Sequence, residues 1–90
     1  MKAMPLKQAE ARLYSVAQRR RGAEITLLTW KQDRSVALEY RDGMLILREH
    51  GYCDEELVFE TAHDLKHSLK AACAREFPRS NRVHVSERVP

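Results

Sequence analysis

Glycine, proline and cysteine are scarce in this chain: its 90 residues include three glycines, three prolines and two cysteines. Cys53 and Cys73 lie outside any CxxC pair, which excludes a disulfide framework and indicates reduced thiols in a cytoplasmic protein. The glycines all lie at predicted turns or helix ends, so the sequence has no glycine-rich loop that could cradle a phosphate. These absences argue against a secreted mini-protein and against a nucleotide-binding enzyme.

Long apolar runs are also missing. No purely apolar run is longer than that at Met44–Leu47, which is far too short to cross a membrane. The N-terminal stretch has no unbroken apolar segment, so we expect neither a signal peptide nor membrane binding. A hydrophobic content of 43% and a charged content of 32% are typical of one small globular domain spanning 1–90. We expect 1–4 and 87–90 to fray, and the thin core to favour a homodimer.

Charge is sorted along the sequence. Residues 1–22 hold six basic residues and one acidic residue, a net charge of +5. Residues 23–60 hold four basic and nine acidic residues, a net charge of −5, and residues 61–90 return to +3. Partners respond to such local fields rather than to the total charge, so the basic ends of the chain are the strongest functional signal.

The first predicted element is a helix from Pro5 to Arg20. Proline suits the first helical position because its missing N–H would have no partner there. Apolar residues then recur every three or four positions, as one buried stripe requires, and Gly22 follows where a left-handed cap is needed. The stripe consists of Leu6, Ala9, Leu13, Val16 and Ala17.

A strand meander is predicted next. The Asp42-Gly43 pair lies between two β-rich segments, which is a strong signal for a type I′ hairpin turn. We expect Trp30, Tyr40 and Phe59 to contribute to the core. The four predicted strands are Glu24–Trp30, Ser35–Tyr40, Met44–Glu49 and Glu55–Glu60.

A second helix is predicted from Ala62 to Phe77. Thr61 is a good N-cap, Asp64 completes a capping box, and Pro78 ends the helix. Its buried stripe consists of Leu65, Leu69, Ala72 and Cys73. The sequence thus predicts an α+β domain: an N-terminal helix, a three- to four-stranded antiparallel meander, a C-terminal helix, and room for a short final strand over 83–86. We expect both helices to cover one face of the sheet.

Metal binding and catalysis are disfavoured by the same pattern. His50 and Cys53, and His63 and His67, have the spacing of ligand pairs. Helical phase turns His63 and His67 away from the core, however, so a shared site would need the loop with His50 and Cys53 to wrap over the outside of the helix. Cys73 lies on the buried stripe, and the acidic residues after Cys53 oppose a thiolate there. We therefore expect no catalytic residues, no metal, no cofactor and no enzyme activity.

The acidic run at 54–56 and Glu60 is better explained as a solvated edge strand, since charges there deter aggregation. The basic residues are the remaining candidates. The helix dipole explains one cation in the last turn of the first helix, but not the whole cluster at 19–21. Ser80 and Asn81 add neutral donors of the kind that contact phosphates. The predicted nucleic-acid contacts are Arg12, Arg19, Arg20, Arg21, Lys66, Lys70, Arg75, Arg79 and Arg82.

Two functions follow as hypotheses. The first is a non-enzymatic protein that binds an RNA or DNA backbone through its basic helix faces and the 75–82 loop, and not through the acidic sheet. Neutralising about five phosphates would give log K a slope of about −4 to −5 against log salt. The alternative is a protein-interaction or homodimeric adaptor module with no nucleic-acid role, whose basic surface is simply solvated or meets an acidic protein.

Overall fold

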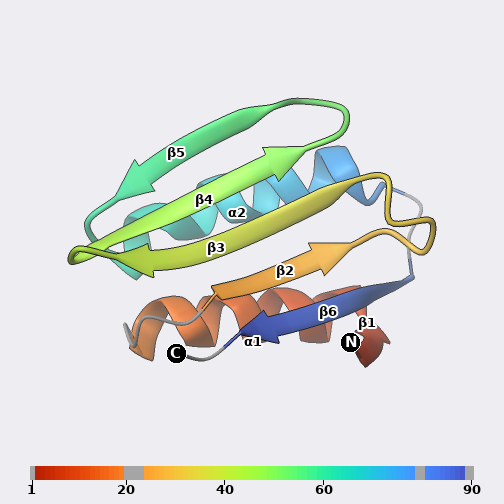
Figure 1. Cartoon of the computed structure of the whole chain (residues 1–90), viewed down its shortest axis with the longest axis horizontal. Coiled ribbons are helices and arrows are strands. Elements are labelled where there is room, and N and C mark those ends of the chain that lie inside the picture. The colour runs from red at the N-terminus through yellow and green to blue at the C-terminus, as the bar shows by residue number, and fades with distance from the viewer. Residues whose placement is uncertain (1, 20–23, 79–80, 89–90) are drawn as a thin grey trace.

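The computed structural model describes residues 2–19, 24–78 and 81–88 of the chain. Within them, two helices and six strands form an α+β arrangement, with four consecutive strands between the helices (Figure 1). The elements are β1 (Lys2–Pro5), α1 (Leu6–Arg19), β2 (Glu24–Leu28), β3 (Ser35–Arg41), β4 (Met44–His50), β5 (Glu55–Phe59), α2 (Ala62–Glu76) and β6 (Arg82–Arg88).

All six strands form one antiparallel sheet in the order β1-β6-β2-β3-β4-β5. The α+β class is as predicted, but three to four strands were too few. Lys2–Pro5, expected to fray or to begin a helix, instead pairs with β6, and β6 extends well beyond 83–86 to lie between β1 and β2. Both strands depend on pairing between distant parts of the chain, which local sequence patterns do not reveal.

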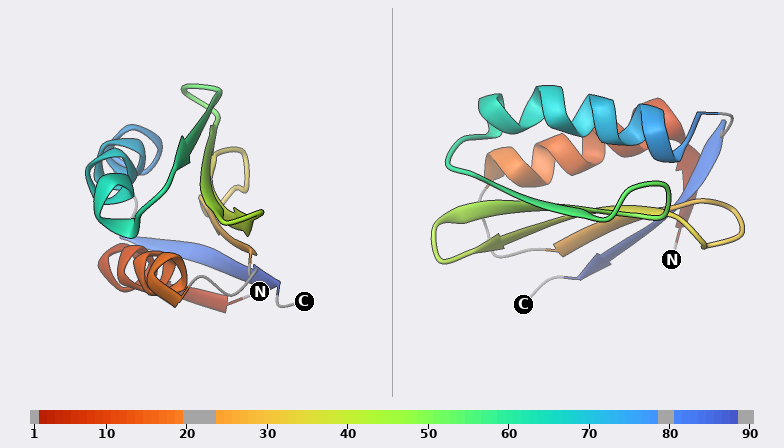
Figure 2. Two further views of the ribbon diagram at one scale, coloured as in Figure 1. Left: turned by 90° about the vertical axis from the view of Figure 1, so that its left-hand side faces the viewer. Right: turned by 90° about the horizontal axis from the view of Figure 1, so that it is seen from above.

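The two helices lie side by side over one face of the sheet (Figure 2). α1 packs on β1, β2 and β6, whereas α2 packs mainly on β4 and its neighbours. Alternating residues of the strands fill the space between the layers, and the predicted stripes of both helices meet them. The largest fully buried apolar side chains are Leu13, Ile25, Leu27, Val36, Leu38, Leu45, Leu65 and Val83. We call the face of the sheet that is turned away from the helices the open face.

The start of α1 differs from the prediction. Pro5 is the last residue of β1, where its partner in register is Arg82, and the helix begins at Leu6. The Leu6 N–H donates to the carbonyl oxygen of Asn81 at 3.0 Å. This bond ties the first turn of α1 to the segment that leads into β6. The predicted cap at Gly22 lies outside the described residues.

Two local predictions are confirmed. Asp42 and Gly43 have φ values of 54° and 79°, as a type I′ turn requires, and they join β3 to β4. The Asp64 N–H donates to Thr61 Oγ1 at 3.1 Å, so Thr61 caps α2. Sequence-local chemistry was sufficient at both places.

The turn after β4 is held by a buried carboxylate at the end of α2. Glu76 is 1% exposed and accepts hydrogen bonds from the N–H groups of Tyr52, at 2.9 Å, and Cys53, at 3.0 Å. Gly51 has a φ of +134°, and a Cβ there would lie 2.6 Å from Cγ of Arg34 and 2.7 Å from Oε1 of Glu76. Only glycine fits this position without displacing a neighbour.

Candidate nucleic-acid interface

The structure does not gather the predicted basic residues on one surface. Arg20, Arg21 and Arg79 lie outside the described residues. The other six, Arg12, Arg19, Lys66, Lys70, Arg75 and Arg82, are spread over the helix layer, the edge of the sheet and the open face.

Lys66 and Lys70 lie one turn apart on α2 and line a groove between the helices. The groove has a volume of about 200 Å³, and its α1 wall brings in Lys7, which the sequence analysis did not single out. The Lys66 Nζ atom lies 5.7 Å from the centroid of the Tyr14 ring, within the range of a cation–π contact. We call this site the lysine groove; it is lined by Lys7, Glu10, Ala11, Tyr14, Lys66, Leu69 and Lys70.

The lysines of the groove keep their charge available. No ion pair in the described part of the chain involves Lys7, Lys66 or Lys70. Glu10 is the single acidic residue among the groove's lining residues. Burial, and then the Glu10 carboxylate, raise the pKa of the Cys73 thiol well above its usual range. Cys73 is therefore an inert part of the core, as predicted.

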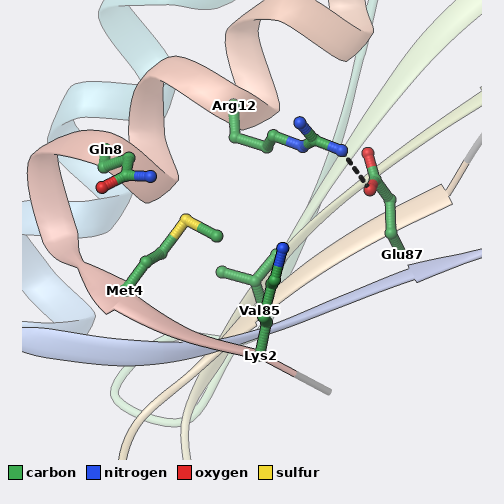
Figure 3. A pocket seen from close by; sticks show the side chains of 6 residues that line it. All are labelled: Lys2, Met4, Gln8, Arg12, Val85 and Glu87. Atoms are coloured by element: carbon green, nitrogen blue, oxygen red, sulfur yellow. Dashed lines mark hydrogen bonds and ion pairs between the residues drawn. The ribbon is translucent and has the colours of Figure 1, made fainter.

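Arg12 points to a different side of α1. Its Nη2 atom lies 2.7 Å from Oε2 of Glu87, across a pocket of about 320 Å³ at the edge of the sheet (Figure 3). This bond raises the pKa of the Arg12 guanidinium. Met4 and Val85 form the apolar part of the pocket, and Lys2 and Gln8 complete it. Arg12 thus belongs to the edge of the sheet and not to the lysine groove.

Arg75 is engaged at the far end of α2. Its Nη2 and Nε atoms lie 2.6 Å and 2.9 Å from the two carboxylate oxygens of Glu49, a bidentate pair. The pair raises the pKa of Arg75 and lowers that of Glu49, whose carboxylate is buried against α2. Arg75 therefore holds α2 to β4 and is poorly placed to reach a phosphate.

At the centre of the open face, the positive charges are paired with carboxylates. Arg48 lies 3.0 Å from Glu39 and 2.9 Å from Glu56, and Arg41 lies 3.0 Å from Glu39. Because these cations already face carboxylates, little free positive charge is left there. Arg82, at one end of this face, donates to the carbonyl oxygen of Ala3 at 3.4 Å. Arg19 is exposed at the end of α1.

Trp30 was expected in the core, and this prediction was wrong. Trp30 is 61% exposed, and its ring stacks on His84 of β6. The alternation of β2 could have shown this: Ile25 and Leu27 face the helices, so the even-numbered positions 24, 26, 28 and 30 face outward. Tyr40 and Phe59 do pack against the core as predicted.

The metal-like pairs do not come together. His63 and His67 are exposed on α2, as their helical phase predicts, and His50 lies 2.6 Å from Asp54. Ligand atoms of Glu49, Cys53 and Glu55 do lie within 4.8 Å of one another, but the Glu49 carboxylate is already paired with Arg75. Burial, followed by the Glu55 and Glu49 carboxylates, raises the pKa of Cys53, so its thiol stays protonated.

Comparison with family models, with curated proteins and with solved structures gives no match for this chain. None of the helices in the described ranges is long and apolar enough to span a membrane. The inference of function therefore depends on the geometry of the surfaces above.

Proposed function

We propose that this α+β domain is a non-enzymatic nucleic-acid-binding protein whose lysine groove holds the sugar-phosphate backbone. The observation that supports this proposal is the convergence of three cations from two helices on one concavity. Lys7 comes from the first turn of α1, and Lys66 and Lys70 come from the middle of α2. No described carboxylate is paired with them, so their charges are free to replace condensed counterions along a polyanion.

The lining of the groove suits a backbone better than it suits a small ligand. Its ammonium groups are flexible point charges, which bind phosphates without demanding one geometry. Tyr14 and Leu69 supply an apolar floor against which a ribose can pack. Backbone contacts of this kind position a protein on nucleic acid without specifying sequence.

The proposal is tested by charge removal in the groove. The triple variant Lys7→Gln, Lys66→Gln and Lys70→Gln should weaken binding of fluorescein-labelled oligouridine roughly a hundredfold at about 0.1 M salt. This magnitude follows from three phosphate contacts on a single strand, each contributing about 0.7 to the salt slope. Fluorescence anisotropy gives the affinity. A wild-type chain that does not bind, or a triple variant that binds equally well, would refute the proposal.

A matched control variant has the same net charge as the groove variant. Lys2→Gln, Arg41→Gln and Arg88→Gln remove three cations that do not line the groove. This control should bind nearly as tightly as the wild-type chain. Equal losses in the two triple variants would mean that only overall charge matters, and the groove would lose its role.

A second candidate function, pairing with another copy or with a protein partner, has its own observation. β5 is an edge strand of the sheet, and Val58 on this strand is 56% exposed. Glu55 and Glu56 are also exposed on this strand, so two copies would bring like charges together. Light scattering at low and high salt tests this pairing. A dimer that forms only at high salt, where the repulsion between these carboxylates is screened, would indicate pairing through the β5 edges. A monomer at both salt concentrations would exclude a homodimer.

A further inference from the structure

Trp30, the single tryptophan of the chain, is held in an exposed position. Its ring lies on the imidazole of His84, with ring centroids 4.3 Å apart and planes inclined by 16°. The residue is 61% exposed, so the contact buries only part of the indole. A large aromatic ring in this position contributes little to the core and remains available to a ligand.

The loop that carries Trp30 is well ordered by its own hydrogen bonds. Thr29 Oγ1 donates to Oδ1 of Asp33 at 2.7 Å and accepts from the Arg34 N–H at 3.3 Å. The Thr29 N–H donates to the Arg34 carbonyl at 3.1 Å, and the Gln32 N–H donates to the Thr29 carbonyl at 2.8 Å. The indole is therefore fixed both by its loop and by its stacking partner, which reduces the entropy cost of binding.

The surroundings of the ring are basic. Lys31 follows Trp30 directly, and Arg82 precedes His84 by two positions on β6, so Arg82 and His84 share the open face. Leu28 pairs with His84 in register, which brings the segment after β2 to the level of Arg82. The neighbouring Asp33 has its pKa lowered by the Thr29 hydroxyl and is the one carboxylate of this loop.

This end of the molecule also joins the lysine groove. The β2–β3 loop lies at the same end as β1 and the start of α1 (Figures 1 and 2). The hydrogen bond from the Leu6 N–H to the Asn81 carbonyl oxygen brings the backbone at the start of α1 close to the backbone at the start of β6.

We infer that Trp30 and His84 form a stacking platform for an unpaired nucleobase, with Lys31 and Arg82 beside it for the flanking phosphates. The inference depends on the proposed function and names its substrate class as single-stranded nucleic acid. A base must leave its duplex to stack on a side chain, and aromatic platforms flanked by cations are the usual means of binding single strands.

The test uses the intrinsic fluorescence of Trp30, because no other tryptophan contributes to the signal. Oligouridine should quench this fluorescence as it binds, whereas a blunt RNA duplex should bind more weakly and leave it unchanged. Trp30→Ala should weaken oligouridine binding roughly ten- to hundredfold in anisotropy, as expected for the loss of one stacked base.

The matched control is Tyr52→Ala, which removes another exposed aromatic residue, 73% exposed in the β4–β5 turn, and should bind oligouridine as the wild-type chain does. Two results together would overturn the platform while leaving the lysine groove intact: normal oligouridine affinity in Trp30→Ala, and unchanged Trp30 fluorescence when the wild-type chain binds oligouridine. Equal quenching by duplex and single strand would overturn the substrate class. If neither nucleic acid binds the wild-type chain, the proposed function itself fails.

Discussion

Gly51 offers the sharpest test of how the structure is held together. Gly51→Ala places a methyl group 2.6 Å from Arg34 and 2.7 Å from the Glu76 carboxylate, at a φ of +134°. A backbone conformation of this kind costs a residue with a side chain about 1–3 kcal/mol. Displacing Glu76 also weakens its two bonds to the turn, and each hydrogen bond to a charged group contributes about 1.5–3 kcal/mol. We expect a loss of about 3–4 kcal/mol because both bonds are stretched rather than broken.

Gly43→Ala is the matched control. Gly43 also has a positive φ, +79°, but a Cβ there meets nothing within 4 Å. Only the left-handed backbone penalty applies, about 1 kcal/mol. Urea unfolding with a slope of about 1 kcal/mol/M should therefore lower the midpoint by about 3 M for Gly51→Ala and by about 1 M for Gly43→Ala. Equal losses of stability would refute the packing argument, since backbone conformation would then explain both.

Three further predictions follow from the described contacts. Arg75 lowers the pKa of Glu49 below its ordinary 4.5, so this carboxylate stabilises the fold above about pH 4.5, and the contribution is lost as the pH falls through the lowered value. The stability of Glu49→Gln should therefore depend less steeply on pH in this acid range. An unchanged pH profile of unfolding would contradict the pairing. Thr61→Ala should cost about 1 kcal/mol in urea unfolding, because the Asp64 N–H loses its acceptor, whereas Thr61→Ser should cost much less. Cys73, fully buried with a raised pKa, should react with a maleimide only under unfolding conditions, so rapid native labelling at this residue by mass spectrometry would contradict its place in the core.

The parts of the fold that local chemistry decides were predictable from the sequence. The hairpin at Asp42-Gly43, the cap at Thr61 and the buried stripes of both helices each follow from a few neighbouring residues. β1 and the full length of β6 were not predictable in this way. Pro5 resembles the first residue of a helix, and only its pairing with Arg82 places it in a strand.

The candidate site was predictable only in part. Lys66 and Lys70 follow from their spacing on one helix, but Lys7 joins them only because α1 and α2 pack side by side. Arg12 and Arg75 look like free cations in the sequence, although distant carboxylates at Glu87 and Glu49 engage them. Ion pairing between distant residues is a property of the folded chain, and a charge count along the sequence does not contain it.

The measurement that tests the central claim most directly is the salt dependence of oligouridine binding. The slope of log K against log salt should become shallower by about 2 when Lys7, Lys66 and Lys70 are replaced by glutamine, because three phosphate contacts are lost. The control variant that lacks the cations of Lys2, Arg41 and Arg88 should keep a slope parallel to the wild type. A groove variant whose slope also matches the wild type would contradict the account.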